Sequence, residues 1–177
     1  AGVLFRSVDS TPSVLALIQD VTARRKEQDA ILEVAKGVSA ESGVGFFKML
    51  LQNLTPALGG FFAFVGMLDV AEPGRINTLA VYNANTSEDN FSYLIEHTPC
   101  ATVTSGQYCI YTERVGEIFP LDRGLVERHA EGYAGAPLVD SKGNPLGLLV
   151  VLFKRPNENP QYVESILRIF ITYASSE

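Results

Sequence analysis

The sequence has 177 residues, of which 46% are hydrophobic, and its formal net charge is −6. This length fits one domain with additional segments, and the hydrophobic content is enough for a substantial core. The negative charge excludes a basic surface for nucleic acid, and no apolar stretch is as long as a membrane span. Two cysteines, Cys100 and Cys109, are too few for a disulfide framework or a thiolate metal site. We therefore expect a cytoplasmic protein without direct contact to nucleic acid or membrane.

The first forty residues divide into two segments. Residues 3–18 hold two short apolar stretches around a polar turn, which predicts a pair of strands that cannot form a core alone. From Asp20 the pattern becomes helical, with a charged first half and a narrow apolar stripe that includes Ile31, Val34 and Val38. We expect residues 1–20 to be the end of a truncated domain and residues 21–40 to be a linker helix.

A second helix is predicted over residues 43–58, where apolar residues recur at helical spacing before Gly59-Gly60. The uninterrupted apolar run 61–68 predicts a central strand that is buried on both faces. After a turn, residues 75–83 alternate as expected for a strand nearer the edge of a sheet. The two expected faces are Ile76, Thr78, Ala80 and Tyr82 against Asn77, Leu79 and Val81.

The middle of the chain is less regular. We expect a loop over 84–90, a short helix over 91–95, an irregular span over 97–107, and short strands over 108–111 and 117–120. Asp122 is suited to cap a short helix that reaches His129. Because the span 96–119 holds the longest irregular stretch, we expect a ligand to bind between it and the sheet.

Residues 132–153 predict a hairpin around the turn 140–145, in which Gly143 takes a positive φ. The apolar run 146–153 predicts a second central strand. Pro137 lacks a backbone N–H, so we expect it at a bulge or facing solvent. For the last helix we expect Asn159 as N-cap and Pro160 as first residue.

The last helix carries two apolar stripes, and one sheet face can cover only one of them. The stripe expected to face the sheet is Val163, Ile166, Leu167, Phe170 and Ala174. The second stripe is Ile169, Ile171 and Tyr173. Apolar stripes left uncovered are usually interaction surfaces, so we expect a homodimer in which Ile169, Ile171 and Tyr173 pair across the interface, together with Ile31, Val34 and Val38.

The order of the elements predicts an α+β fold, with an antiparallel sheet flanked by helices. Asp20-Val21-Thr22 followed by Arg24-Arg25-Lys26 resembles the end of a PAS domain and the start of its basic linker helix. From Tyr93 onward the sequence resembles the GAF domains of bacterial sensory proteins. The matching motifs are Thr98-Pro99-Cys100, Gly106 to Cys109 with Ile110-Tyr111, Phe119-Pro120 with Asp122, Tyr133 to Leu138, and Asp140 with Gly143 and Leu146-Gly147.

The resemblance implies a GAF domain over residues 41–177 with a PAS-like (profilin-like) antiparallel sheet, helices packed on one side and a ligand pocket on the other. In such proteins the domain relays a signal to an output module of histidine-kinase (two-component) or diguanylate-cyclase (GGDEF) type. We therefore expect a regulatory sensor, not an enzyme, in this part of the protein.

Aromatic side chains are common in small-molecule sites. The candidates are Phe64, Tyr82, Tyr93, Tyr108, Phe119 and Tyr133, although Phe64 is also a typical core residue. The ligand-binding set that we predict is Phe64, Cys100, Tyr108, Cys109, Phe119, Tyr133 and Ala136. Free cysteines are often simply small buried hydrophobes, and no basic neighbour marks either cysteine as a thiolate. We therefore expect both to be dispensable for folding and to form no structural disulfide.

The cofactor is left unknown, but three are disfavoured. His97 and His129 lack further ligands at a recognisable spacing, which argues against haem or a metal. Neither Cys100-Ala101 nor Cys109-Ile110 is the Cys-His pair that bilin attachment in GAF domains uses. The Asn-Lys-Phe-Asp-Glu signature of cyclic-nucleotide-binding GAF domains is also absent.

Three functions remain open at this stage. The first is a sensor that binds a small molecule and biases the terminal helices. The second is a dimerisation and relay module with a collapsed pocket. The third is a cysteine-based reductase of free methionine sulfoxide, known in one GAF branch, which requires a nucleophilic thiolate near a second thiol.

Overall fold

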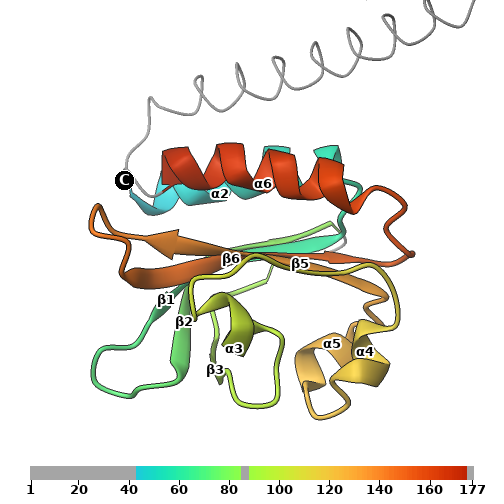
Figure 1. Cartoon of the computed structure of the whole chain (residues 1–177), viewed down its shortest axis with the longest axis horizontal. Helices are drawn as coiled ribbons and strands as arrows, with labels where there is room; N and C mark the ends of the chain where they lie inside the picture. Colours follow the sequence, from blue (N-terminus) through green and yellow to red (C-terminus); the bar gives the residue numbers. More distant parts are fainter. Residues whose placement is uncertain (1–42, 85–87, 175–177) are drawn as a thin grey trace, which may run out of the picture.

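The computed structural model describes residues 43–84 and 88–174, and these form one antiparallel sheet with helices on both faces (Figure 1). The strand order is β3-β2-β1-β6-β5-β4. The strands are β1 Phe62–Leu68, β2 Arg75–Asn83, β3 Ser92–Leu94, β4 Cys109–Tyr111, β5 Gly132–Val139 and β6 Pro145–Phe153. The predicted α+β fold is therefore confirmed. The predictions for residues 1–42 lie outside the described residues.

The two long helices cover one face of the sheet, and the short elements cover the other (Figure 1). The long helices are α2 Val44–Ala57 and α6 Pro160–Ala174. The short helices are α3 Cys100–Val103, α4 Val115–Ile118 and α5 Arg123–Glu127. We call the first face the helix face and the second the cleft face.

The central strands β1 and β6 are buried on both faces, as their uninterrupted apolar runs predict. In β1, Ala63 and Val65 point into the core under α2 and α6, whereas Phe62 and Phe64 point into the core of the cleft face. Strands β1 and β6 also approach closely. A Cβ atom at Gly147 would lie 2.1 Å from the Gly66 carbonyl oxygen, so the backbone contact there requires glycine.

Local signals place the turns and helix ends correctly. Gly143 has a φ of 85°, and the Asp140 carboxylate accepts hydrogen bonds from the amides of Lys142 and Asn144, both at 2.8 Å. The Asp122 carboxylate accepts a hydrogen bond from Leu125 N at 3.2 Å at the start of α5. The Asn159 side chain likewise accepts one from Tyr162 N at 3.1 Å at the start of α6. The positive φ of Gly143 and the caps at Asp122 and Asn159 are therefore confirmed.

Two secondary-structure predictions on the cleft face are wrong. Residues 91–95 hold strand β3 instead of a helix, because Ser92–Leu94 extend the sheet beside the start of β2. Residues 117–120 hold the end of helix α4 instead of a strand. Both segments are short, so their conformation depends on packing against the sheet more than on local preference.

Strand β2 does not keep one face along its whole length. Val65 pairs with Ala80 and Gly66 with Thr78, so Leu79 is an extra residue in a bulge. The bulge exchanges the two faces of the strand: Ile76 lies in the cleft-face core and Ala80 in the helix-face core. The strict alternation predicted for residues 75–83 is therefore wrong.

Pro137 is buried and pairs with Leu148 of β6, and the register shift comes one residue later, between Leu138 and Val139. The prediction of a solvent-facing or bulged proline is therefore wrong. Strand β4 pairs only with residues 133–135 of β5. At Pro137 the strand thus has a partner on one side, where a missing N–H can be tolerated.

The last helix covers the sheet with the predicted stripe, whose five residues are all buried. The second stripe is smaller than predicted. Ile171 is only 6% exposed and belongs to the core of its own chain, so a place for it in a dimer interface is wrong. Ile169 is half-buried and remains available to a partner.

Candidate functional site

A cleft with a volume of about 630 Å³ opens on the cleft face of the sheet. Its floor comes from β1, β5 and β6, one wall from residues 88–100 and the other from residues 121–128. The floor is apolar, and the charged side chains lie on the walls. The residues that line the floor are Phe62, Phe64, Tyr133, Val150 and Leu152.

Four aromatic rings form the apolar end of the cleft. Phe62 and Phe64 reach the same face because they are two residues apart in β1. Phe91 lies 5.5 Å from Phe64 between ring centroids, and Tyr93 lies 5.8 Å from Phe64 with its ring nearly perpendicular, at 87°. Edge-to-face contacts of this kind hold the rings in defined positions.

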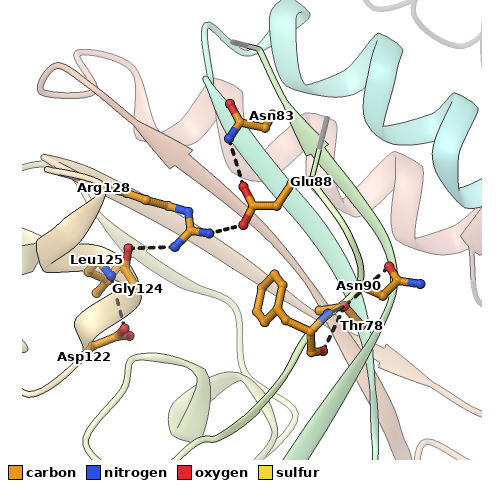
Figure 2. A network of polar contacts seen from close by, with 9 residues as sticks. Thr78, Asn83, Glu88, Asn90, Asp122, Gly124, Leu125 and Arg128 are labelled. Atoms are coloured by element: carbon orange, nitrogen blue, oxygen red, sulfur yellow. Dashed lines mark hydrogen bonds and ion pairs between the residues drawn. The ribbon is translucent and has the colours of Figure 1, made fainter. Parts of the chain in front are cut away.

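Arg128, directly after α5, extends over this aromatic group. Its guanidinium carbon lies 4.2 Å from the Phe62 ring centroid and 6.0 Å from that of Phe91. Figure 2 shows the guanidinium between Glu88, with which it forms an ion pair, and the Gly124 carbonyl oxygen, to which it donates at 3.5 Å. The Arg128 and Glu88 side chains are each 26% exposed, so water screens the pair only in part.

Hydrogen bonds to β2 fix the wall that carries Glu88 (Figure 2). The second Glu88 carboxylate oxygen accepts from Asn83 Nδ2 at 2.9 Å. The Thr78 hydroxyl accepts from Phe91 N at 2.7 Å and donates to Phe91 O at 3.0 Å. Asn90 Nδ2 donates to Leu79 O at 3.1 Å. Hydrogen bonds with β2 thus set where the charge of Glu88 lies.

Asp122 adds a second carboxylate to the opposite wall. It caps α5, and burial raises the pKa of its carboxyl group although backbone amides and Arg128 favour the charged form. The structure therefore holds a partly desolvated carboxylate near the Arg128 guanidinium.

Cys100 lies at the bottom of the cleft between two tyrosines. Tyr93 Oη donates to its sulfur at 3.1 Å, and the Tyr133 hydroxyl lies 3.3 Å from the sulfur. Burial raises the pKa of the Cys100 thiol, and it also raises the pKa of the Cys109 thiol. Both thiols are free. Among the described residues no cation lowers this pKa, so the Cys100 thiol is not activated as a nucleophile.

The cleft brings together three of the seven predicted ligand-binding residues: Phe64, Cys100 and Tyr133. Ala136 instead lies in the helix-face core. Tyr108 packs on the same face, where the guanidinium carbon of Arg168 in α6 lies 4.1 Å from the Tyr108 ring centroid. Cys109 and Phe119 belong to the cleft-face core without lining the cleft. These four assignments are corrected by the position of each side chain.

Of the predicted span 96–119, only Glu96, Thr98 and Cys100 line the cleft. The residues that we did not predict are mainly Phe62, Phe91, Glu88, Asp122 and Arg128. The two-residue spacing to Phe64 points to Phe62. No sequence signal points to the Glu88–Arg128 pair, because its members are forty positions apart and meet only in the folded chain.

No candidate metal site stands out in the described part of the chain. It contains no cluster of three or more His, Cys, Asp or Glu side chains that could hold a metal ion. His97 and His129 are both exposed. None of its helices has the length and hydrophobicity needed to cross a bilayer. The arrangement is suited to binding a small molecule by apolar and charged contacts.

The fold is similar to that of solved structures, although the sequence matches no known family. No family model matches the sequence, and no curated protein matches it either. The structure, however, is similar to the GAF domain of a phosphoenolpyruvate-protein phosphotransferase from Coxiella burnetii. The TM-score is 0.69 with 15% identity over 87% of this chain and 93% of that one.

Two further solved structures extend the comparison. A putative GAF sensor protein from Burkholderia vietnamiensis has a TM-score of 0.65 at 11% identity, over 97% of this chain and 94% of that one. The chromophore-binding domain of Stigmatella aurantiaca phytochrome P1 has a TM-score of 0.64 at 11% identity, over 97% of this chain and 62% of that one. At these identities the similarity shows the fold: the chain has the GAF fold.

Proposed function

We propose that this chain is a regulatory GAF domain that binds a small organic molecule in the cleft. The observation that carries the proposal is the cleft itself. Its volume of about 630 Å³ lies in the usual range of small-molecule sites, and it combines an apolar floor with a few placed charges. The domain needs no such opening if it acts only as a dimerisation and relay module.

The relay part of the proposal rests on the two ends of the chain. Residues 1–20 resemble the end of a PAS domain and residues 21–40 a linker helix, while α6 lies near the other end. We propose that a ligand in the cleft biases these terminal helices in a cytoplasmic, bacterial signalling protein. The signal then passes to an output module of histidine-kinase or diguanylate-cyclase type. A ligand shifts such an equilibrium only by its different affinities for the two states.

A homodimer through the terminal helices completes this relay. Ile169 on α6 supports it, being apolar and half-buried on a helix whose other apolar face already packs on the sheet. A methionine sulfoxide reductase receives no support from the thiols, because burial raises the pKa of both and leaves the reactive thiolate form disfavoured.

Native mass spectrometry of the 177-residue protein tests whether the cleft binds a ligand. The protein is incubated with a bacterial small-molecule extract and separated from unbound material. Leu121→Trp places a larger side chain at the edge of the cleft, where Leu121 is 67% exposed, so the change costs little stability. Val70→Trp is the matched control, because Val70 is 99% exposed and lies in the turn between β1 and β2, away from the cleft.

We expect wild type and Val70→Trp to retain the same small molecule and Leu121→Trp to retain less of it. Equal retention by all three proteins would place the ligand elsewhere. If wild type retains no small molecule here and binds none in solution, the domain is not a ligand sensor and the dimerisation module takes its place.

A further inference from the structure

The charges of the cleft are unequal and define the kind of ligand that it accepts. Carboxylates outnumber guanidinium groups on its walls. The charged lining residues are Glu88, Asp89, Glu96, Asp122, Arg123, Glu127 and Arg128. This surplus of negative charge repels a polyanion such as a nucleotide phosphate. Yet a positive charge also lies directly over the aromatic floor, because the Arg128 guanidinium carbon is 4.2 Å from the Phe62 ring centroid.

Arg128 still has hydrogen-bonding capacity. A guanidinium carries five N–H donors. Within residues 43–84 and 88–174, the partners of the Arg128 guanidinium are one oxygen of Glu88 and the Gly124 carbonyl oxygen. The remaining donors are held in a half-buried position beside the cleft and fit the two oxygens of a ligand carboxylate.

A carboxylate alone is an incomplete match. A ligand carboxylate on the remaining donors of Arg128 shares the guanidinium with Glu88, whose other oxygen accepts a hydrogen bond from the neutral Asn83 side chain. Asp122, on the same wall as Arg128, is partly buried, and within the described residues backbone amides and Arg128 favour its charged form. A positively charged group on the same ligand would compensate both carboxylates.

We infer that the cleft recognises a small zwitterion: a carboxylate binds the free donors of Arg128, an ammonium group lies between Glu88 and Asp122, and an apolar body rests on Phe64 and Tyr93. This is the chemistry of a free amino acid with an apolar side chain. Such a ligand has no net charge, so the acidic walls do not repel it, and its two charged groups add ion pairs to the one between Glu88 and Arg128. The inference rests on the proposed function, since it requires that the cleft binds a ligand.

Matched probes separate the two charges of the ligand. Phenylalanine and leucine carry both groups, phenylalaninamide lacks the carboxylate, and N-acetylphenylalanine lacks the ammonium group. We expect isothermal titration calorimetry on the 177-residue protein to show binding of at least one of the two amino acids. For phenylalanine or leucine alike, we expect the corresponding amide and N-acetyl derivatives to bind at least about tenfold more weakly.

Two variants assign each charge to its residue. In Arg128→Gln, the amino acid should bind no more tightly than its amide. In Glu88→Gln, the amino acid should bind no more tightly than its N-acetyl derivative. Arg168→Gln and Glu164→Gln are the controls, because these residues form an exposed ion pair on α6, remote from the cleft. Arg128→Gln also loses the cation–π contact with Phe62 and could unfold for that reason. Arg128→Lys is the second variant for that case, because it keeps the positive charge but lacks the paired N–H donors of the guanidinium.

The outcomes distinguish the inference from the proposed function. If the N-acetyl derivative binds as tightly as the amino acid, the cleft recognises an anion. If the amide binds as tightly as the amino acid, the cleft recognises a cation. Either result overturns the zwitterion. If no amino acid binds at about 10 mM while mass spectrometry shows another ligand retained in the cleft, the zwitterion is wrong and the sensor proposal stands. If nothing binds in either experiment, the proposed function itself fails.

Discussion

Cys100 is held by two buried hydroxyl groups, those of Tyr93 and Tyr133. Burial raises the pKa of both tyrosines well above the usual value, so both remain protonated at neutral pH. Cys109 differs in its surroundings: its hydrogen-bond partner Tyr111 is half-buried and can turn to water. The same substitution at the two cysteines should therefore lower the free energy of unfolding by different amounts.

We expect Cys100→Ala to lower the free energy of unfolding by about 1–3 kcal/mol, because it leaves a small void and removes the partner of two buried hydroxyls. Cys109→Ala should cost less. The double variant should still fold. Urea unfolding measures all three, and a larger cost at Cys109, or an insoluble double variant, would contradict this assignment of the two thiols.

At the scale of the element, the turn between β5 and β6 depends on one carboxylate. Asp140 accepts hydrogen bonds from Lys142 N, Asn144 N and the Asn144 side chain, each at 2.8 Å. The hydrogen bond from the Asn144 side chain is the largest cause of its lowered pKa, followed by that from the Asn144 amide. The charged form of Asp140 is thus favoured by the folded turn.

This shift predicts how the turn responds to acid. A carboxyl group whose pKa is lowered in the folded state contributes stability above its unfolded pKa, here near 3.8, and loses it as the pH falls through the lower folded value. The difference in unfolding free energy between wild type and Asp140→Ala should therefore be largest at neutral pH and shrink below the unfolded pKa. Urea unfolding across this range is the measurement, and a difference independent of pH would rule out the charge as its cause.

At the scale of the whole molecule, the predicted dimer depends on the outer side of α6. Burial of Ile171 leaves Ile169 as the described residue of the second stripe that a partner can reach; Ile31, Val34 and Val38 lie outside the described residues. One half-buried apolar residue is too little for a stable interface, so the predicted dimer also requires the apolar stripe predicted for residues 31–38.

Sedimentation velocity at micromolar concentration tests the pairing. We expect wild type to sediment as a dimer and both Ile169→Glu and Ile31→Glu to shift it toward monomer, because each buries a charge in an apolar interface. Thr172→Glu is the control, since Thr172 is exposed on the same helix. A wild type that stays monomeric, or a control that dissociates like Ile169→Glu, would remove the dimer through these helices.

The sequence by itself determined the elements whose signals are local or repeated. The apolar runs of β1 and β6 require burial on both faces, Asp122 and Asn159 cap their helices, and Gly143 takes a positive φ, because each follows from neighbouring residues. Three residues of the predicted ligand-binding set also line the cleft. Phe64, Cys100 and Tyr133 are apolar or weakly polar. Such residue types are common both in the lining of a cleft and in a core, so residue type alone can point to them.

Only the tertiary structure decided which face of the sheet each remaining side chain occupies. Tyr108 and Ala136 lie on the helix face because alternation along β4 and β5 places them there, whereas the bulge at Leu79 exchanges the two faces of β2. The Glu88–Arg128 pair likewise exists only after folding, because an ion pair between residues forty positions apart depends on how α5 and the segment after β2 pack on the sheet. Local preferences carry no information about such a contact, and the charges that define the cleft arise from it.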